Sequence, residues 1–167
     1  AFTGATKKFS YSRHVKDGVG EASKLKVKKE EVSVPIPEGV EDGESFLMRG
    51  YGEEILDGEP GDLHIYIRII PEKNYVRRNL NLYTRAEVKL TDILLGGKVV
   101  IKDIFRRDYV LELPELHNPQ KEVIVKGAGM KRGSRKGDLF VALELVMPKR
   151  LDKETRQILE TIKKNGL

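Results

Sequence analysis

The feature that most constrains this chain is a short glycine motif that occurs twice. Residues 46–52 (FLMRGYG) are echoed by residues 123–129 (VIVKGAG), and each motif is followed, after a charged loop, by Gly-Asp-Leu at 61–63 and 137–139. The tripeptides are 76 positions apart and the motifs 77, and an apolar stretch follows each tripeptide. Features that recur in one order at one spacing predict tandem copies of a single folding unit.

Two further pairs extend the repeat and reveal a difference between its copies. Pro37 and Pro114 are separated by the same 77 positions, whereas Gly4 and Gly96 are separated by 92. The first copy therefore contains about 15 extra residues, which we assign to a hairpin arm at residues 15–30.

Alternation of apolar and polar residues predicts short strands around the motifs. In residues 7–13, Phe9 and Tyr11 alternate with polar neighbours, and residues 23–29 alternate in the same way. This period of two is typical of half-buried strands. The Asp/Gly-rich segment at 17–20 lies between them, so we expect the two strands to form a hairpin.

Further strands are predicted at residues 80–90 and 98–105, again bounded by glycine turns. Short strands at this spacing are typical of small sandwiches and barrels. We therefore predict a mainly all-β fold with two tandem small β-sandwich or barrel-like lobes, at residues 1–76 and 77–150. A C-terminal α-helix is predicted to follow at 151–167.

Only the end of the chain has clear helical periodicity. Asp152 can cap a helix there, and Leu151, Ile158, Leu159 and Ile162 recur at helical spacing. This apolar stripe is compatible with packing against the second lobe and equally with contact between two copies of the chain. Ile158, Leu159 and Ile162 are therefore our candidate dimerisation residues.

The net charge of +5 is concentrated in patches. Residues 1–30 hold eight Lys and Arg against three acids, and residues 121–136 hold six against one. Such patches attract phosphates or acidic surfaces, although lysines also protect strand edges from unwanted pairing. Together with an isoelectric point near 9.3, the patches motivate one hypothesis, a nucleic-acid-binding module with weak affinity for DNA.

Several classes of site are not indicated. The chain has no Cys, which excludes disulfides and cysteine–zinc sites and suits a reducing cytoplasm. The three histidines, His14, His64 and His117, lack the spacing of metal ligands. The acids at 53–54 are interpreted as residues that merely solvate a turn. We expect no metal, no cofactor, no membrane partner and no enzymatic activity.

With these elements in place, the sequence resembles the C-terminal client-binding region of DnaJ-type co-chaperones. The matching segments follow the family order through nearly the whole chain: residues 1–8 (AFTGATKK), 34–43 (VPIPEGVEDG), 49–52 (RGYG), 61–63 (GDL), Arg77, 81–83 (NLY), 95–97 (LGG), 126–129 (KGAG) and 137–139 (GDL). The sequence lacks the family's J-domain signature and its zinc module, and the Cys-free arm stands in place of that module. The resemblance thus places the chain with the zinc-less members, as a piece of a longer protein.

The resemblance implies that the chain holds extended apolar segments of non-native polypeptide for transfer to a DnaK-type chaperone. That partner would be engaged mainly through a J-domain, and the family implies a cytoplasmic homodimer with a role in protein folding and the stress response. In this family an apolar groove on the first lobe takes a client segment as an added strand.

The strand that matches this groove implies the candidate client-binding residues. Phe9 and Tyr11 would make the apolar contacts, and Lys7 and Lys8 would flank them. Tyr75 matches a family aromatic, although the His-Pro that precedes it in the family is replaced here. The alternation of Phe9 and Tyr11 is equally compatible with side chains that fill the core of the first lobe.

Overall fold

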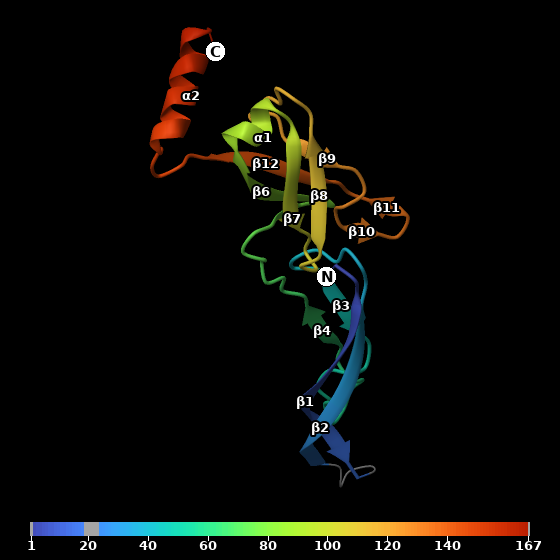
Figure 1. The fold of residues 1–167 in the computed structure, drawn as a ribbon. Helices are drawn as coiled ribbons and strands as arrows, with labels where there is room; N and C mark the ends of the chain where they lie inside the picture. Colours follow the sequence, from blue (N-terminus) through green and yellow to red (C-terminus); the bar gives the residue numbers. More distant parts are fainter. Residues whose placement is uncertain (1, 19–23, 167) are drawn as a thin grey trace. The chain divides into compact units, whose positions relative to one another are not determined.

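The computed structural model describes residues 2–18 and 24–166 and is mainly β, as predicted (Figure 1). The strands are β1 (Ala5–Asp17), β2 (Lys24–Ile36), β3 (Ser45–Met48), β4 (Leu63–Tyr66), β5 (Val76–Arg78), β6 (Asn81–Lys89), β7 (Gly97–Lys102), β8 (Asp108–Leu113), β9 (Val123–Val125), β10 (Lys131–Arg132), β11 (Arg135–Lys136) and β12 (Leu139–Val146). The helices are α1 (Leu90–Leu94) and α2 (Lys153–Lys164). The predicted C-terminal helix is thus confirmed.

The chain divides by its contacts into two compact units. Unit 1 comprises Ala1–Thr84 and Ile124–Phe140, and unit 2 comprises Arg85–Val123 and Val141–Leu167. The boundaries fall inside three strands, β6, β9 and β12, of a four-stranded sheet with the order β5-β6-β12-β9. The successive lobes with a boundary at residue 76 stay a prediction.

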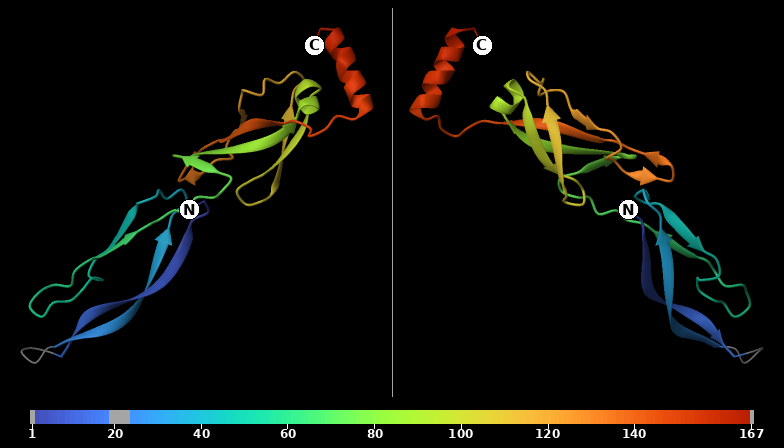
Figure 2. Two further views of the ribbon diagram at one scale, coloured as in Figure 1. Left: turned by 90° about the vertical axis from the view of Figure 1, so that its left-hand side faces the viewer. Right: turned by 45° about the vertical axis from the view of Figure 1, so that its right-hand side comes forward.

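Each unit contains an antiparallel hairpin, and the two hairpins differ in length. In unit 1, β1 pairs with β2 over 13 residues per strand, and in unit 2, β7 pairs with β8 over 6. Both views in Figure 2 show β1 and β2 side by side along their length. The extra residues of the first copy therefore lengthen both strands of its hairpin. Residues 19–23, which include part of the expected turn, lie outside the described residues.

Two glycines that enter these hairpins have matching surroundings. Gly4 and Gly96 both have positive φ angles, of 67° and 72°. A Cβ atom on Gly4 would lie 3.0 Å from the carbonyl oxygen of Ile36, and one on Gly96 would lie 3.1 Å from that of Leu113. Glycine alone adopts this conformation at no steric cost, so both copies use one turn at equivalent positions.

In the first copy, the glycine motif and the Gly-Asp-Leu tripeptide are joined by two hydrogen bonds. The backbone N–H of Gly50 donates to Oδ1 of Asp62 at 2.9 Å. The N–H of Gly52 donates to the carbonyl of Gly61 at 2.7 Å. These bonds hold the end of β3 against the start of β4, and this pairing continues as a two-stranded sheet.

The second copy makes the same closure. The N–H of Gly127 donates to Oδ1 of Asp138 at 2.7 Å, and that of Gly129 donates to the carbonyl of Gly137 at 3.0 Å. The sequence repeat therefore corresponds to a repeated three-dimensional element, in which the aspartate of Gly-Asp-Leu satisfies the backbone of the first glycine.

Most of the core is formed by the inward faces of the strands, and Val40, Ile93 and Met130 join it from loops and from α1. In unit 1 the buried side chains include Val15, Val32, Val34, Val40, Leu82, Val125, Met130 and Leu139. In unit 2 they include Ala86, Val88, Ile93, Val99, Ile101, Leu111, Leu113, Val141 and Leu143. β-Branched residues are frequent in both sets, as expected for packed strand faces.

The expectation that only the chain end is helical is wrong in one place. Residues Leu90–Leu94 form the short helix α1, in which Ile93 is buried. The N–H of Leu95 donates to the carbonyl of Thr91 at 2.9 Å, and Gly96 follows with its positive φ. A single turn that ends at a glycine is too short to produce a recognisable helical period.

We predict that Gly52→Ala destabilises the chain, because the added methyl group would lie 2.6 Å from the carbonyl carbon of Gly61. The expected loss in the free energy of unfolding is about 1–3 kcal/mol, as for overpacked sites. Gly61→Ala is the matched control, since its Cβ would lie 3.5 Å from the nearest atom, and it should change stability by about 1 kcal/mol or less. Urea denaturation measures both, and equal stabilities would contradict the closure described above.

Candidate functional site

Phe9 and Tyr11 lie on the face of β1 that packs inside unit 1. Phe9 is opposite Val32 in the antiparallel pair, and opposite residues share a face. Val32 is 3% exposed, whereas the two aromatic side chains are half-buried, with ring centroids 6.3 Å apart. The two rings therefore contribute to the packing of unit 1 and also present part of their surface to solvent.

The other candidate client-binding residues lie in different places. Lys7 is exposed on the same face as Phe9, opposite Val34. Lys8 is exposed and, by the alternation of β1, lies on the opposite face. Tyr75 is half-buried in the turn before β5, where its N–H donates to the carbonyl of Glu72 at 3.2 Å.

The distal end of β1 is covered by the loop that connects β3 and β4. The N–H of His14 donates to Oε2 of Glu53 at 2.6 Å, and its carbonyl accepts from the N–H of Glu54 at 3.0 Å. The N–H of Lys16 donates to Oε2 of Glu54 at 2.7 Å. The hydrogen bond from the His14 backbone lowers the pKa of the Glu53 carboxyl, so this contact favours the charged form.

These contacts fix which backbone groups of β1 point away from β2. In an antiparallel pair, the N–H and C=O groups of alternate residues face the partner strand, and those of the residues between face outward. His14 and Lys16 face outward, so Lys8, Ser10 and Ser12 do so too. In the described part of the chain β1 pairs with β2 alone. The segment from Thr6 to Ser12 is therefore an open strand edge.

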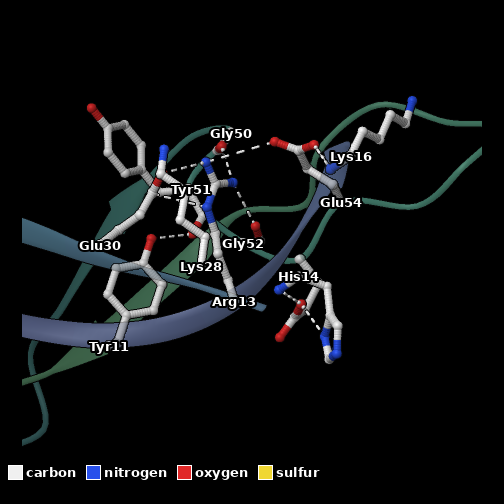
Figure 3. A network of polar contacts seen from close by, with 11 residues as sticks. Tyr11, Arg13, His14, Lys16, Lys28, Glu30, Gly50, Tyr51, Gly52 and Glu54 are labelled. Carbon is white, nitrogen blue, oxygen red and sulfur yellow. Dashed lines mark hydrogen bonds and ion pairs between the residues drawn. The ribbon is translucent and has the colours of Figure 1, made fainter. Parts of the chain in front are cut away.

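Arg13 connects the hairpin to this loop (Figure 3). Its guanidinium makes two contacts with Glu30, at 2.9 and 3.2 Å, and donates to the carbonyls of Gly50 at 3.1 Å and Gly52 at 2.8 Å. Glu54 lies 3.7 Å from it. The Arg13 side chain is only 11% exposed, so these bonds form away from bulk water and hold the loop firmly.

Tyr11 supports the same loop from the neighbouring position on this face. Its hydroxyl donates to the carbonyl of Tyr51, and burial raises the pKa of the phenol. The hydrogen bond from Arg13, followed by that from Lys28, lowers the pKa of the Glu30 carboxyl. Tyr11 therefore has two roles in the fold, a half-buried ring and a hydroxyl bonded to the loop.

The interpretation of residues 53–54 as acids that merely solvate a turn is wrong. Both carboxylates accept hydrogen bonds from the backbone of β1. The sequence contained one signal for this. The repeat aligns Glu53 and Glu54 with Met130 and Lys131, so the acids are specific to the first copy. The hydrogen bonds between Arg13 and this loop are not predicted by the sequence either, because strand alternation does not identify a partner in a distant loop.

Within residues 2–18 and 24–166, no three His, Asp or Glu side chains are grouped so that they could hold a metal ion. None of the helices in that part of the chain combines the length and the apolar character that a membrane crossing requires.

The apolar stripe of α2 is not buried in unit 2. Ile158 is 54% exposed, Leu159 39% and Ile162 38%, and no residue of α2 is buried. The predicted cap is confirmed, since Oδ1 of Asp152 accepts from the N–H of Thr155 at 2.7 Å. The structure therefore contradicts one of the two alternatives for this stripe, namely packing against the second lobe.

Comparison with known proteins identifies the family. The DnaJ C terminal domain family matches residues 1–148. The chain belongs to this family. Among curated relatives, the Chaperone protein DnaJ of Sinorhizobium medicae is 34% identical over 137 residues, which cover 80% of this chain and 36% of that protein. That of Allorhizobium ampelinum is 32% identical over 133 residues, covering 78% and 35%. That of Lactobacillus delbrueckii subsp. bulgaricus is 30% identical over 146 residues, covering 85% and 38%.

The chain thus spans little more than a third of the length of these DnaJ relatives. The predicted resemblance is confirmed.

We predict that Arg13→Met weakens the fold of unit 1. Methionine keeps the apolar stem but removes the hydrogen bonds to Glu30, Gly50 and Gly52, so the free energy of unfolding should fall by about 1.5–3 kcal/mol. Arg85→Met is the control, because it removes the same charge from an exposed pair with Glu144 and should cost less than about 1 kcal/mol. Chemical denaturation compares them, and similar losses would show that Arg13 is no more than a surface pair.

Proposed function

We propose that this chain binds an extended apolar segment of non-native polypeptide as an additional strand along the open edge of β1. The observation that carries the proposal is the edge itself, from Thr6 to Ser12, beside the half-buried rings of Phe9 and Tyr11. Backbone groups on a strand edge can pair with a segment of any sequence, and alternate side chains then supply apolar contact. This combination suits a chaperone that accepts many clients.

The flanking residues fit this proposal to different degrees. Lys7 shares the face of Phe9, so it would meet the client side chains that point toward the rings. Lys8 would meet those on the opposite face. Tyr75 is a third candidate aromatic contact, by analogy with the family.

The wider setting of this activity is also a proposal. The client would pass to a DnaK-type chaperone in the cytoplasm, the chain would act as a homodimer, and it would have no enzymatic activity of its own. The names of the relatives support a chaperone role and give no support to the nucleic-acid-binding alternative.

We predict that Phe9→Ser combined with Tyr11→Ser weakens binding of a reduced, alkylated polypeptide by about tenfold or more, because two partly exposed aromatic contacts are lost. Fluorescence anisotropy measures the affinity, and circular dichroism checks the fold. Leu47→Ser combined with Tyr66→Ser is the matched control, since both residues are exposed on another strand pair of unit 1 and should leave binding unchanged.

The same titration, run with the polypeptide and with DNA at several salt concentrations, separates the client-binding function from the nucleic-acid-binding alternative. Apolar binding should persist as salt is raised, whereas phosphate-driven binding to DNA should weaken steeply. Unchanged affinity of a folded Phe9/Tyr11 variant for the polypeptide would refute the proposed site.

We predict that Ile158→Glu combined with Ile162→Glu lowers the sedimenting mass from dimer to monomer, because two charges would be placed in an apolar contact. Gln157→Glu combined with Thr161→Glu adds the same charges to a different side of α2 and should preserve the dimer. Equal masses for the two variants would rule out this stripe as the dimer contact.

A further inference from the structure

The loop between β3 and β4 occupies part of the edge at which the proposed client would bind. At His14 and Lys16 the outward N–H groups of β1 already donate to the carboxylates of Glu53 and Glu54, and the outward carbonyl of His14 already accepts from the N–H of Glu54. These are the groups with which an added strand would otherwise pair. The two acids thus replace a partner strand at the distal end of β1.

The loop is anchored by contacts other than these. Arg13 donates to the carbonyls of Gly50 and Gly52, and the Tyr11 hydroxyl donates to that of Tyr51. Nζ of Lys16 donates to the carbonyl of Gly58 at 3.1 Å. An incoming strand would have to break several of these bonds to displace the acids, so the covered end of the edge resists competition.

Comparison of the two copies separates this arrangement from the ordinary geometry of the repeat. The carbonyl of Glu53 accepts from the N–H of Gly61 at 2.9 Å, and the carbonyl of Met130 accepts from that of Gly137 at 2.8 Å. The carbonyl of Glu53 therefore makes a backbone hydrogen bond that is common to both copies. Its carboxylate contact with β1 is an addition, because the equivalent Met130 has no such group.

We propose that Glu53 and Glu54 form a stop that limits the length and fixes the register of the bound client strand. This inference rests on the proposed function. The stop leaves an edge of about seven residues, from Thr6 to Ser12, or roughly 23 Å at the rise of a β-strand. A client segment gains backbone hydrogen bonds until it fills that edge, and further residues gain none. Glu53 and Glu54 are thus specificity-determining residues for the length of the client segment.

The test uses the full chain and peptides of alternating leucine and serine, from about five to about thirteen residues long. On the wild-type chain, affinity should rise with length and level off near seven residues. Glu53→Ala combined with Glu54→Ala frees the N–H groups of His14 and Lys16, while the backbone N–H of residue 54 still donates to the His14 carbonyl. Affinity should therefore keep rising beyond seven residues, to about eleven, as the client pairs with the freed N–H groups. For that length we expect binding about fivefold tighter than wild type or more, from the added backbone bonds.

Two matched variants isolate the cause. Glu53→Gln combined with Glu54→Gln keeps an oxygen acceptor at each position, so its length dependence should follow the wild type. Glu59→Ala removes a negative charge from the same loop, at an exposed position, and should also follow the wild type. If the glutamine pair behaved like the alanine pair, charge rather than occupation of the edge would be responsible, and the stop would be disproved.

Amide exchange on the wild-type chain tests the stop without any substitution. The amides of His14 and Lys16 should be protected before peptide is added, and those of Lys8, Ser10 and Ser12 only afterwards. The proposal would be overturned if the amides of His14 and Lys16 were unprotected in the free chain and became protected only when peptide is added. So would one length curve shared by the wild type and the alanine pair.

Further outcomes distinguish failure of the stop from failure of the proposed client-binding function. If no peptide of any length bound the wild type, or if binding survived the Phe9/Tyr11 substitutions, the proposed function would itself be wrong. If peptides bound at β1 with the predicted dependence on Phe9 and Tyr11 but without a plateau near seven residues, only the stop would be wrong.

Discussion

The closure between the glycine motif and Gly-Asp-Leu is the constraint on which the rest of unit 1 depends. The Asp62 carboxylate satisfies the backbone of Gly50, and the bare Cα of Gly52 lets the next strand approach closely. This brings the carbonyls of Gly50 and Gly52 to the place where Arg13 binds them. The loop, its two acids and the covered end of β1 are therefore consequences of one turn whose geometry requires glycine.

The repetition of this closure explains the architecture, and the differences between the copies set the first copy apart as the place of the proposed site. Both copies form the same turn into a hairpin and the same Gly–Asp contact, at Asp62 and Asp138. The hairpin of the first copy is about twice as long as that of the second, and its Arg13 bonds to the loop between β3 and β4 (Figure 3). Each copy carries a hairpin on the same scaffold, whereas the longer hairpin of the first copy extends to His14 and Lys16, where Glu53 and Glu54 contact it.

The sequence predicted what depends on local chemistry. Alternation identified the strand that carries Phe9 and Tyr11, and a side-chain cap with a terminal stripe identified α2. It did not predict what depends on contacts between distant segments. The short helix α1 has too few residues for a period, and the acids at 53–54 resemble any charged loop until the fold brings them to His14 and Lys16. The resemblance groups Lys8 with Lys7, but neighbouring strand residues face opposite ways, so the two lysines lie on different faces of β1.

An open strand edge is both useful and hazardous, and this balance accounts for the form of the proposed site. The backbone groups that would accept any client segment would also accept a second copy of β1, which is how edge strands cause aggregation. Short edges and flanking lysines are known protections against such pairing. Lys7 and Lys8 stand near one end of the edge, and the Glu53/Glu54 contacts close the other. An edge of about seven residues is long enough to hold an extended segment. It is too short for the β1 strands of two copies to pair along their whole length. The proposed stop would therefore restrict self-association as well as client length.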